Sequence, residues 1–132
     1  MTSSLGTKTV DVSKHGVIFA SAQKNLGPAG ITVVIVRDDL IGIQRSYTPN
    51  MFNWKTTIDT KSIFNTTPCF AVYMLGMYAN YLNMNGGVPV FEDLAQRRSK
   101  LIYDTIDGSN GFYKGFVTNH DDRSRLNAVF KI

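Results

Sequence analysis

Lys24 is the residue of this sequence with the clearest capacity for covalent chemistry. It follows a short apolar run, residues 17–20, and is flanked by the amide side chains of Gln23 and Asn25. A lysine drawn into a low-dielectric pocket loses part of its preference for the ammonium form. The free amine is then a nucleophile that can form a Schiff base with an aldehyde cofactor. The alternative is an ordinary solvated lysine in a turn, and the spacing alone favours that alternative.

A second candidate is the polar run Asn65, Thr66 and Thr67 at the expected start of a long helix. The free N–H groups of a helix start, its partial positive charge and two neighbouring hydroxyls suit a phosphate group. The alternative is a plain helix cap, with Thr66 or Thr67 at the N-cap and Pro68 at the first helical position. Caps of this kind are common, so these residues by themselves favour the cap.

The remaining chemically capable side chains give weaker signals. His15 and His120 are far apart in the sequence and have no ligand-spaced partner, so a zinc site is not expected. Cys69 follows Pro68 at a helix start, where a thiol can be activated, but a buried and inert cysteine is the simpler interpretation. As the only cysteine it cannot form an internal disulfide, which favours a reducing compartment.

Two apolar runs, residues 17–20 and 31–36, predict buried strands that would position Lys24. The second run is almost wholly β-branched, and a run that is apolar on both faces is typical of a strand between two layers of an α/β protein. Gly27, Pro28 and Gly30 mark a turn between the runs. About ten intervening residues are too few for a crossover helix, so the two strands are predicted to pair antiparallel.

The segment after the second strand has little regular pattern. Residues 37–42 predict a single helical turn that Gly42 stops. From about residue 43 to residue 63 there is no steady period, and we predict an extended, irregular segment. Its length favours a functional segment over a plain connector.

The second half of the chain predicts two helices and a strand. The first helix begins at Pro68 and ends at Asn85-Gly86-Gly87. Its apolar stripe has helical spacing and consists of Phe70, Tyr73, Met74, Met77, Tyr78 and Tyr81. The second helix, from about residue 88 to residue 106, has an apolar face made of Phe91, Leu94, Ala95, Leu101 and Ile102. Residues 126–132 alternate in polarity and predict a strand with one buried face.

Composition and charge narrow the class of protein. The chain has 132 residues, a net charge of +4, 43% apolar residues and 18% charged residues. These values exclude a disordered chain, and the apolar runs are too short to cross a bilayer. No apolar stretch follows a basic start, so no signal peptide is expected. The length suits one domain, and the dispersed basic residues give nucleic-acid binding little support.

Five blocks of the sequence carry a resemblance to one family. They are residues 11–30 (DVSKHGVIFASAQKNLGPAG), 32–40 (TVVIVRDDL), 64–68 (FNTTP), 85–87 (NGG) and 123–127 (RSRLN). In this order and spacing they closely resemble the phosphoserine aminotransferases, which are pyridoxal-phosphate enzymes of fold type I. The blocks extend over essentially the whole chain, and their combination is specific although no single block is.

The resemblance implies roles for five residues. Lys24 matches the catalytic lysine that holds pyridoxal 5'-phosphate through a Schiff base, and Gln23 matches a residue that hydrogen-bonds the cofactor phosphate. Asn65 and Thr66 match the pair that reaches the phosphate of the cofactor in the neighbouring subunit. Ser3 falls in the family's Ser-Ser segment near the cofactor. The implied assembly is a homodimer with shared active sites, and no metal is implied.

The resemblance also implies the reaction. Glutamate gives its amino group to the cofactor, and the cofactor then aminates 3-phosphohydroxypyruvate to O-phospho-L-serine in serine biosynthesis. This is a ping-pong scheme in which the lysine shuttles the proton between substrate and cofactor. The implied partners are these small-molecule substrates, with no nucleic acid and no membrane, and the implied location is cytoplasmic.

The implied fold is α/β and divides the chain into three parts. Residues 1–67 match the end of the large cofactor-binding domain, which has a mostly parallel sheet with one antiparallel strand. Residues 68–87 match a connecting helix, and residues 88–132 match the beginning of the small α+β domain.

Departures from the family pattern lead to a further expectation. The aspartate that pairs with the pyridinium nitrogen is expected just before Met1, and the substrate-binding Gly-His-Arg and Gly-Gly-x-Arg segments are expected after Ile132. Thr67 stands where the family's Asn-Thr-Pro-Pro has its first proline. We therefore expect an internal fragment or truncated form that does not transaminate alone. The alternative is a catalytically inactive truncated product that binds a full-length subunit.

Overall fold

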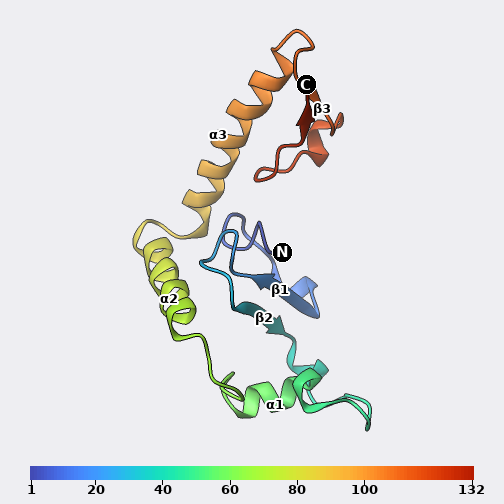
Figure 1. Ribbon diagram of the computed structural model, residues 1–132, viewed down its shortest axis with the longest axis vertical. Coiled ribbons are helices and arrows are strands. Elements are labelled where there is room, and N and C mark those ends of the chain that lie inside the picture. The colour runs from blue at the N-terminus through green and yellow to red at the C-terminus, as the bar shows by residue number, and fades with distance from the viewer. The chain divides into compact units, whose positions relative to one another are not determined.

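A β-hairpin and two long helices make up most of the regular structure in the computed structural model, which describes residues 1–132 (Figure 1). The strands are β1 (Val17–Ser21), β2 (Thr32–Val36), β3 (Lys114–Gly115) and β4 (Phe130–Lys131), and the α-helices are α1 (Trp54–Asp59), α2 (Cys69–Met84) and α3 (Val88–Asp107). Short 3-10 helices cover Val12–Lys14, Asp38–Leu40, Asn50–Phe52 and His120–Asp122.

The chain divides into two compact units. Unit 1 comprises Met1–Thr2 and Val10–Asn80, and unit 2 comprises Ser3–Thr9 and Tyr81–Ile132. The boundary falls within α2, so it does not coincide with the divisions expected at residues 67/68 and 87/88, which stay a prediction. None of the helices combines the length and the apolar composition that a bilayer crossing requires.

The hairpin of unit 1 confirms the antiparallel pairing predicted for the two apolar runs. β1 and β2 pair antiparallel, with Ile18 opposite Ile35 and Ala20 opposite Val33. The prediction that both faces are buried is wrong: Ile18 and Ala20 are buried, but Phe19 is 61% exposed. The rest of unit 1 covers only one face of β1, so its burial alternates.

The segment from residue 43 to residue 63 contains a helix that its sequence pattern did not predict. α1 has six residues, and the Asn53 side chain caps it by accepting from the Lys55 N–H at 3.0 Å. Lys55 also pairs with Asp59 one turn later, at 2.9 Å. The helix depends on an N-cap and one i,i+4 ion pair rather than on an apolar stripe, which explains why periodicity did not reveal it.

The first long helix is confirmed, but its packed face differs from the predicted stripe. Ala71 is buried and Leu75 and Tyr78 are half-buried, whereas Phe70 is 70% exposed and Tyr73 is 62% exposed. α2 is apolar nearly all round, and in such a helix spacing alone cannot select the buried face. Its end is as predicted, because the Gly87 N–H donates to the Leu82 carbonyl at 2.8 Å in the pattern of a Schellman cap.

Unit 2 is organised around α3, which begins at Val88 and ends at Asp107 close to the predicted bounds. Its buried residues are Ala95, Ser99 and Ile106, whereas Leu101 and Ile102 are exposed, contrary to prediction. The expected strand over residues 126–132 is reduced to β4, which pairs antiparallel with β3. Residues 124–127 form a turn instead, because Ser124 Oγ accepts from the N–H groups of Leu126 and Asn127.

Candidate functional site

The turn between β1 and β2 places Gln23 and Lys24. The N–H groups of Leu26 and Gly27 both donate to the Ala22 carbonyl, at 3.1 and 2.9 Å, and close the turn. Ala22 and Leu26 are buried, at 0% and 6% exposure. Gln23 and Lys24 lie between these two anchors and are exposed. The backbone at Lys24 is therefore held from both sides while its side chain remains accessible.

The residues of this chain do not form a low-dielectric pocket around Lys24. Its side chain is exposed, as in the alternative of a solvated lysine in a turn. The structure thus gives Lys24 a fixed backbone position and access to a reactant, but it does not shield the amine from water.

Helix α2 is the platform on which this turn rests. A Cβ atom added to Gly30 would lie 3.8 Å from Pro68 Cγ, and one added to Gly27 would lie 3.7 Å from the Leu75 backbone nitrogen. The Tyr78 hydroxyl also donates to Asn25 Oδ1, at 3.5 Å. The turn and the first half of α2 therefore pack directly against each other.

Asn65 and Thr66 lie in the segment just before α2, and both are exposed. The helix begins at Cys69, one residue later than predicted, and its first turn is closed by the Val72 N–H donating to the Pro68 carbonyl at 3.1 Å. Asn65 Nδ2 contacts Met51 Sδ at 3.5 Å. Thr66 and Thr67 do not donate or accept a capping hydrogen bond, so the predicted cap is wrong and the Thr66 hydroxyl is available to a ligand.

Ser3 belongs to unit 2, where Asn127 Nδ2 donates to Ser3 Oγ at 3.2 Å. Ser3 borders a cavity of about 390 Å³ whose wall includes Lys8, Arg123 and Arg125. Of these, Arg123 is committed to the protein: its side chain is only 10% exposed and forms a two-point contact with Asp107, at 2.5 and 2.9 Å.

Two carboxylates of unit 2 are electrostatically stabilised. The hydrogen bonds from Arg123 lower the pKa of Asp107 below its ordinary value. The pKa of Glu92 is also lowered, first by the backbone N–H of Thr9 and then by the side chain of Arg125. No local signal in the sequence points to this contact between Glu92 and Thr9, which lies 83 residues away.

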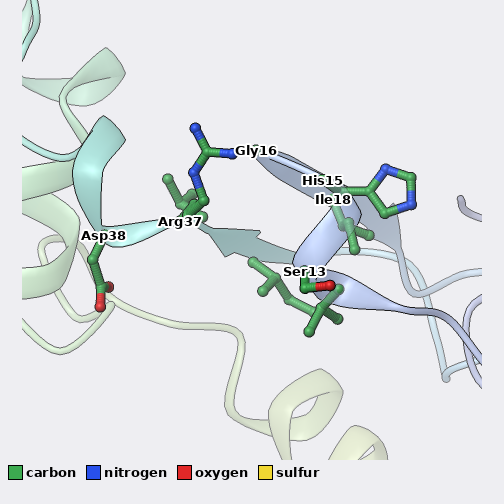
Figure 2. Close-up of a pocket in the computed structure, with 9 residues that line it drawn as sticks. Ser13, His15, Gly16, Ile18, Arg37 and Asp38 are labelled. Carbon is green, nitrogen blue, oxygen red and sulfur yellow. The ribbon is translucent and has the colours of Figure 1, made fainter.

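A separate cavity of about 270 Å³ lies in unit 1, where the segment before β1 meets the end of β2 (Figure 2). Ser13, His15, Gly16, Ile18, Arg37 and Asp38 line it, together with three apolar residues. It contains none of the predicted site residues, and its Arg37 is already paired with Asp39, at 2.9 Å for Nη2. The structure holds no group of three or more side chains that could bind a metal ion.

The class of protein follows from a comparison with known families. All of residues 1–132 match the family described as aminotransferase class-V. The chain therefore belongs to the class-V aminotransferase family.

Within this family the chain is similar to phosphoserine aminotransferases. It is 48% identical to the enzyme of Drosophila melanogaster and 45% identical to that of Lysinibacillus sphaericus, in each case over 100% of this chain and 36% of the relative. Its fold matches the solved phosphoserine aminotransferase from Bacillus circulans subsp. alkalophilus, with a TM-score of 0.94 and 38% identity, over 100% of this chain and 36% of that one.

A second solved structure, the PLP-bound phosphoserine aminotransferase from Trichomonas vaginalis, matches with a TM-score of 0.88 and 30% identity. The match covers 98% of this chain and 36% of the Trichomonas vaginalis chain. The chain thus spans 36% of the length of the relatives that it matches, and its α/β fold is that of the corresponding part of these enzymes.

Proposed function

We propose that this chain is part of a phosphoserine aminotransferase. The proposed reaction transfers the amino group of glutamate to 3-phosphohydroxypyruvate and yields 2-oxoglutarate and O-phospho-L-serine. The observation that carries the proposal is the match of the whole chain to curated phosphoserine aminotransferases at 45–48% identity. The presentation of Lys24 by an anchored turn supports it. Both findings favour the enzyme over the alternative of an inactive binding product.

The residues present fit pyridoxal 5'-phosphate. An aldehyde requires an accessible primary amine, which Lys24 provides, and a phosphate requires hydrogen-bond donors, which the exposed side chains of Gln23, Asn65 and Thr66 provide. When bound, the cofactor supplies the electron sink for cleavage of a bond at the substrate α-carbon.

Lys24 has two proposed roles. Its Nζ would hold the cofactor by condensing with the aldehyde, with loss of water, and would so fix the position of the ring. With that bond exchanged for one to the substrate amine, Nζ would be placed to take the proton from the substrate α-carbon and deliver it to the former aldehyde carbon of the cofactor. The buried neighbours Ala22 and Leu26 support both roles, because they keep the backbone at Lys24 from shifting between the two steps.

The other proposed site residues bind and orient. Gln23 donates its amide to the cofactor phosphate, and Ser3 contributes its hydroxyl beside the cofactor. Asn65 and Thr66 donate to the phosphate of the cofactor held by a second subunit, which requires a homodimer with shared active sites. We further propose a cytoplasmic location, in line with the single unpaired Cys69. The three-part domain division at residues 1–67, 68–87 and 88–132 belongs to the same proposal.

The experiment is an assay of glutamate-dependent amination of 3-phosphohydroxypyruvate by the holoenzyme that contains this chain. Lys24→Ala removes the amine and should reduce turnover by several orders of magnitude, whereas Lys14→Ala, a matched change at an exposed lysine of the same unit, should leave it near the wild-type level. Equal turnover by the Lys24→Ala and Lys14→Ala variants would contradict the proposal.

A further inference from the structure

The segment Arg123-Ser124-Arg125-Leu126-Asn127 is one of the five blocks of the family resemblance, yet the proposed function gives it no task. Its first residue is fixed by three separate contacts. The Arg123 guanidinium binds Asp107 at two points, its Nε donates to the Val117 carbonyl at 3.2 Å, and its Cζ lies over the Tyr103 ring, 4.8 Å from the ring centroid. Such a side chain anchors the start of the segment to the end of α3.

Ser124 then determines the direction of the residues that follow. Its Oγ accepts from the N–H groups of Leu126 and Asn127, at 3.2 and 3.1 Å, and forms a tight turn. Its carbonyl accepts from the Tyr103 hydroxyl at 2.9 Å. This turn is the reason that the strand predicted from residue 126 does not begin there. It also fixes the backbone of Asn127.

Asn127 and Glu92 connect this frame to residues 3–9. Asn127 Nδ2 donates to Ser3 Oγ at 3.2 Å, and Glu92 accepts from the Thr9 N–H at 3.0 Å while it also binds Arg125 at 2.8 Å. Both ends of the Ser3–Thr9 segment are thus tied to the same frame. Between the two ties Thr7 is buried, at 8% exposure.

The direction of the Asn127 hydrogen bond determines what Ser3 can do. A hydroxyl that accepts from an amide keeps its own hydrogen and a second lone pair, and the accepted bond restrains the rotation of the O–H about the Cβ–Oγ bond. Ser3 borders the cavity of about 390 Å³, whereas Asn127 is not one of the residues that line it. Asn127 therefore restrains the Ser3 hydroxyl and leaves its hydrogen free for donation to a ligand.

We infer that Asn127 is a positioning residue that holds the Ser3 hydroxyl as a hydrogen-bond donor for pyridoxal 5'-phosphate, with residues 123–126 as the frame that orients Asn127. This inference rests on the proposed function, because it assigns to Ser3 the cofactor contact proposed there. It makes Asn127 act on the cofactor only through Ser3.

The test is a double-mutant cycle on the affinity of the holoenzyme for pyridoxal 5'-phosphate, measured by absorbance titration. Ser3→Ala should weaken binding about 2- to 12-fold, the range expected for one hydrogen bond. Asn127→Ala should weaken it by no more than that factor and should have no further effect in the Ser3→Ala background. In the Ser3→Thr background, where a hydroxyl remains, the effect of Asn127→Ala should return. Asn83→Ala, on the exposed side of α2, is the matched control and should leave affinity unchanged.

Two results would overturn the inference. One is an unchanged affinity in Asn127→Ala, and the other is a loss that adds fully to that of Ser3→Ala. Should Asn127→Ala fail to fold, Asn127→Asp keeps the size of the side chain and the backbone bonds to Ser124 but cannot donate, and the same cycle applies to it. The Lys24→Ala variant separates this inference from the proposed function: unchanged cofactor binding there contradicts the function itself, whereas loss of binding there with an additive cycle contradicts only the role of Asn127.

Discussion

Lys24 is positioned by its neighbours rather than by contacts of its own. Ala22 and Leu26 are buried on either side of it, and Asn25 accepts a hydrogen bond from Tyr78 of α2. An exposed amine on an anchored backbone is suited to a covalent bond with an incoming aldehyde, because bond formation does not require the turn to open. At the residue scale, Lys24 combines an accessible amine with a fixed backbone position.

Reduction of the cofactor-loaded enzyme with borohydride should attach the cofactor to Lys24. The proposed bond is a Schiff base, which borohydride converts into a stable amine, and only the linked lysine is converted. Peptide mapping by mass spectrometry identifies the modified residue. A label on Lys14 or Lys8, the nearest lysines that precede it in the sequence, would reject the assignment.

Thr66→Ala should weaken cofactor retention more than it weakens folding. The Thr66 hydroxyl is exposed and makes no hydrogen bond within the chain, so its removal leaves no protein partner unsatisfied. Loss of one hydrogen bond to a charged phosphate costs about 1.5–3 kcal/mol of binding free energy. Cofactor retention is measured by dialysis of the holoenzyme followed by quantification of the bound cofactor, with Thr67→Ala as the control. Equal retention by the two variants would count against the phosphate contact.

At the scale of elements, the sequence was most informative where a local pattern sets the structure. Two apolar runs around a Gly-Pro turn predicted β1 and β2 and their pairing, and Gly86 and Gly87 predicted the end of α2. α1 was missed because a single capping residue, Asn53, carries it. The buried face of α2 was misjudged because the partner surface, and not the helix, decides which of several apolar faces packs.

Local patterns also could not predict the contacts that support the candidate site. Lys24, Gln23, Asn65, Thr66 and Ser3 could be named from motif resemblance, but the contacts that hold them join residues far apart in the sequence. Tyr78 reaches Asn25 across 53 positions, and Asn127 reaches Ser3 across 124. No periodicity or spacing encodes such pairs, so the supporting residues became visible only in the fold.

Glycine substitutions should separate helix propensity from backbone strain in unit 1. Gly76 is exposed within α2 with no atom within 4 Å of an added Cβ, so Gly76→Ala should stabilise the fold by about 0.5–1 kcal/mol. Gly30 has φ +114°, and an added Cβ would meet only ordinary contacts with Pro68. Gly30→Ala should therefore destabilise through its backbone, by roughly 1–2 kcal/mol.

Urea unfolding of both glycine variants measures these changes. Gly42→Ala, with φ +84° and open space around the added Cβ, is the control for strain without packing. Destabilisation by Gly76→Ala would show that the space around this position is filled, and a neutral result for Gly30→Ala would show that residue 30 does not have a positive φ.

The stability of unit 2 should fall as acid protonates Asp107. Its pKa in the folded chain is below the ordinary value of 3.8, so the stabilisation by the Arg123 pair is fully present above about pH 3.8. That stabilisation is lost as the pH falls from 3.8 through the lower folded value. Asp107→Asn removes the titration and should flatten the dependence of the unfolding temperature on pH in this range. Identical slopes for the wild type and Asp107→Asn would exclude the pair as the cause.

At the scale of the whole molecule, exposed apolar surface is the dominant physical property. The accessible surface is 9639 Å², whereas two separate compact units, each of half the 14.7 kDa mass, would together expose about 8,400 Å². No large side chain is fully buried, and Phe19, Phe70, Leu101 and Phe116 are all more than half exposed.

We therefore expect the isolated 132-residue chain to self-associate. The surface in excess of that of two compact units is about 1,200 Å², more than the roughly 800 Å² per partner that a standard protein interface covers. At about 25 cal/mol per Å² of apolar area, burial of such a surface strongly favours association over a free monomer.

Sedimentation velocity over a range of concentrations should show species larger than 14.7 kDa, and a dye that fluoresces on apolar surface should bind. Phe70→Ser, on the exposed side of α2, should reduce both signals, whereas Asn80→Ser, at an exposed polar position of the same helix, should not. A monomer at all concentrations with no dye binding would mean that the chain buries these side chains within itself, and that the packed faces of β1 and α2 differ from those described here.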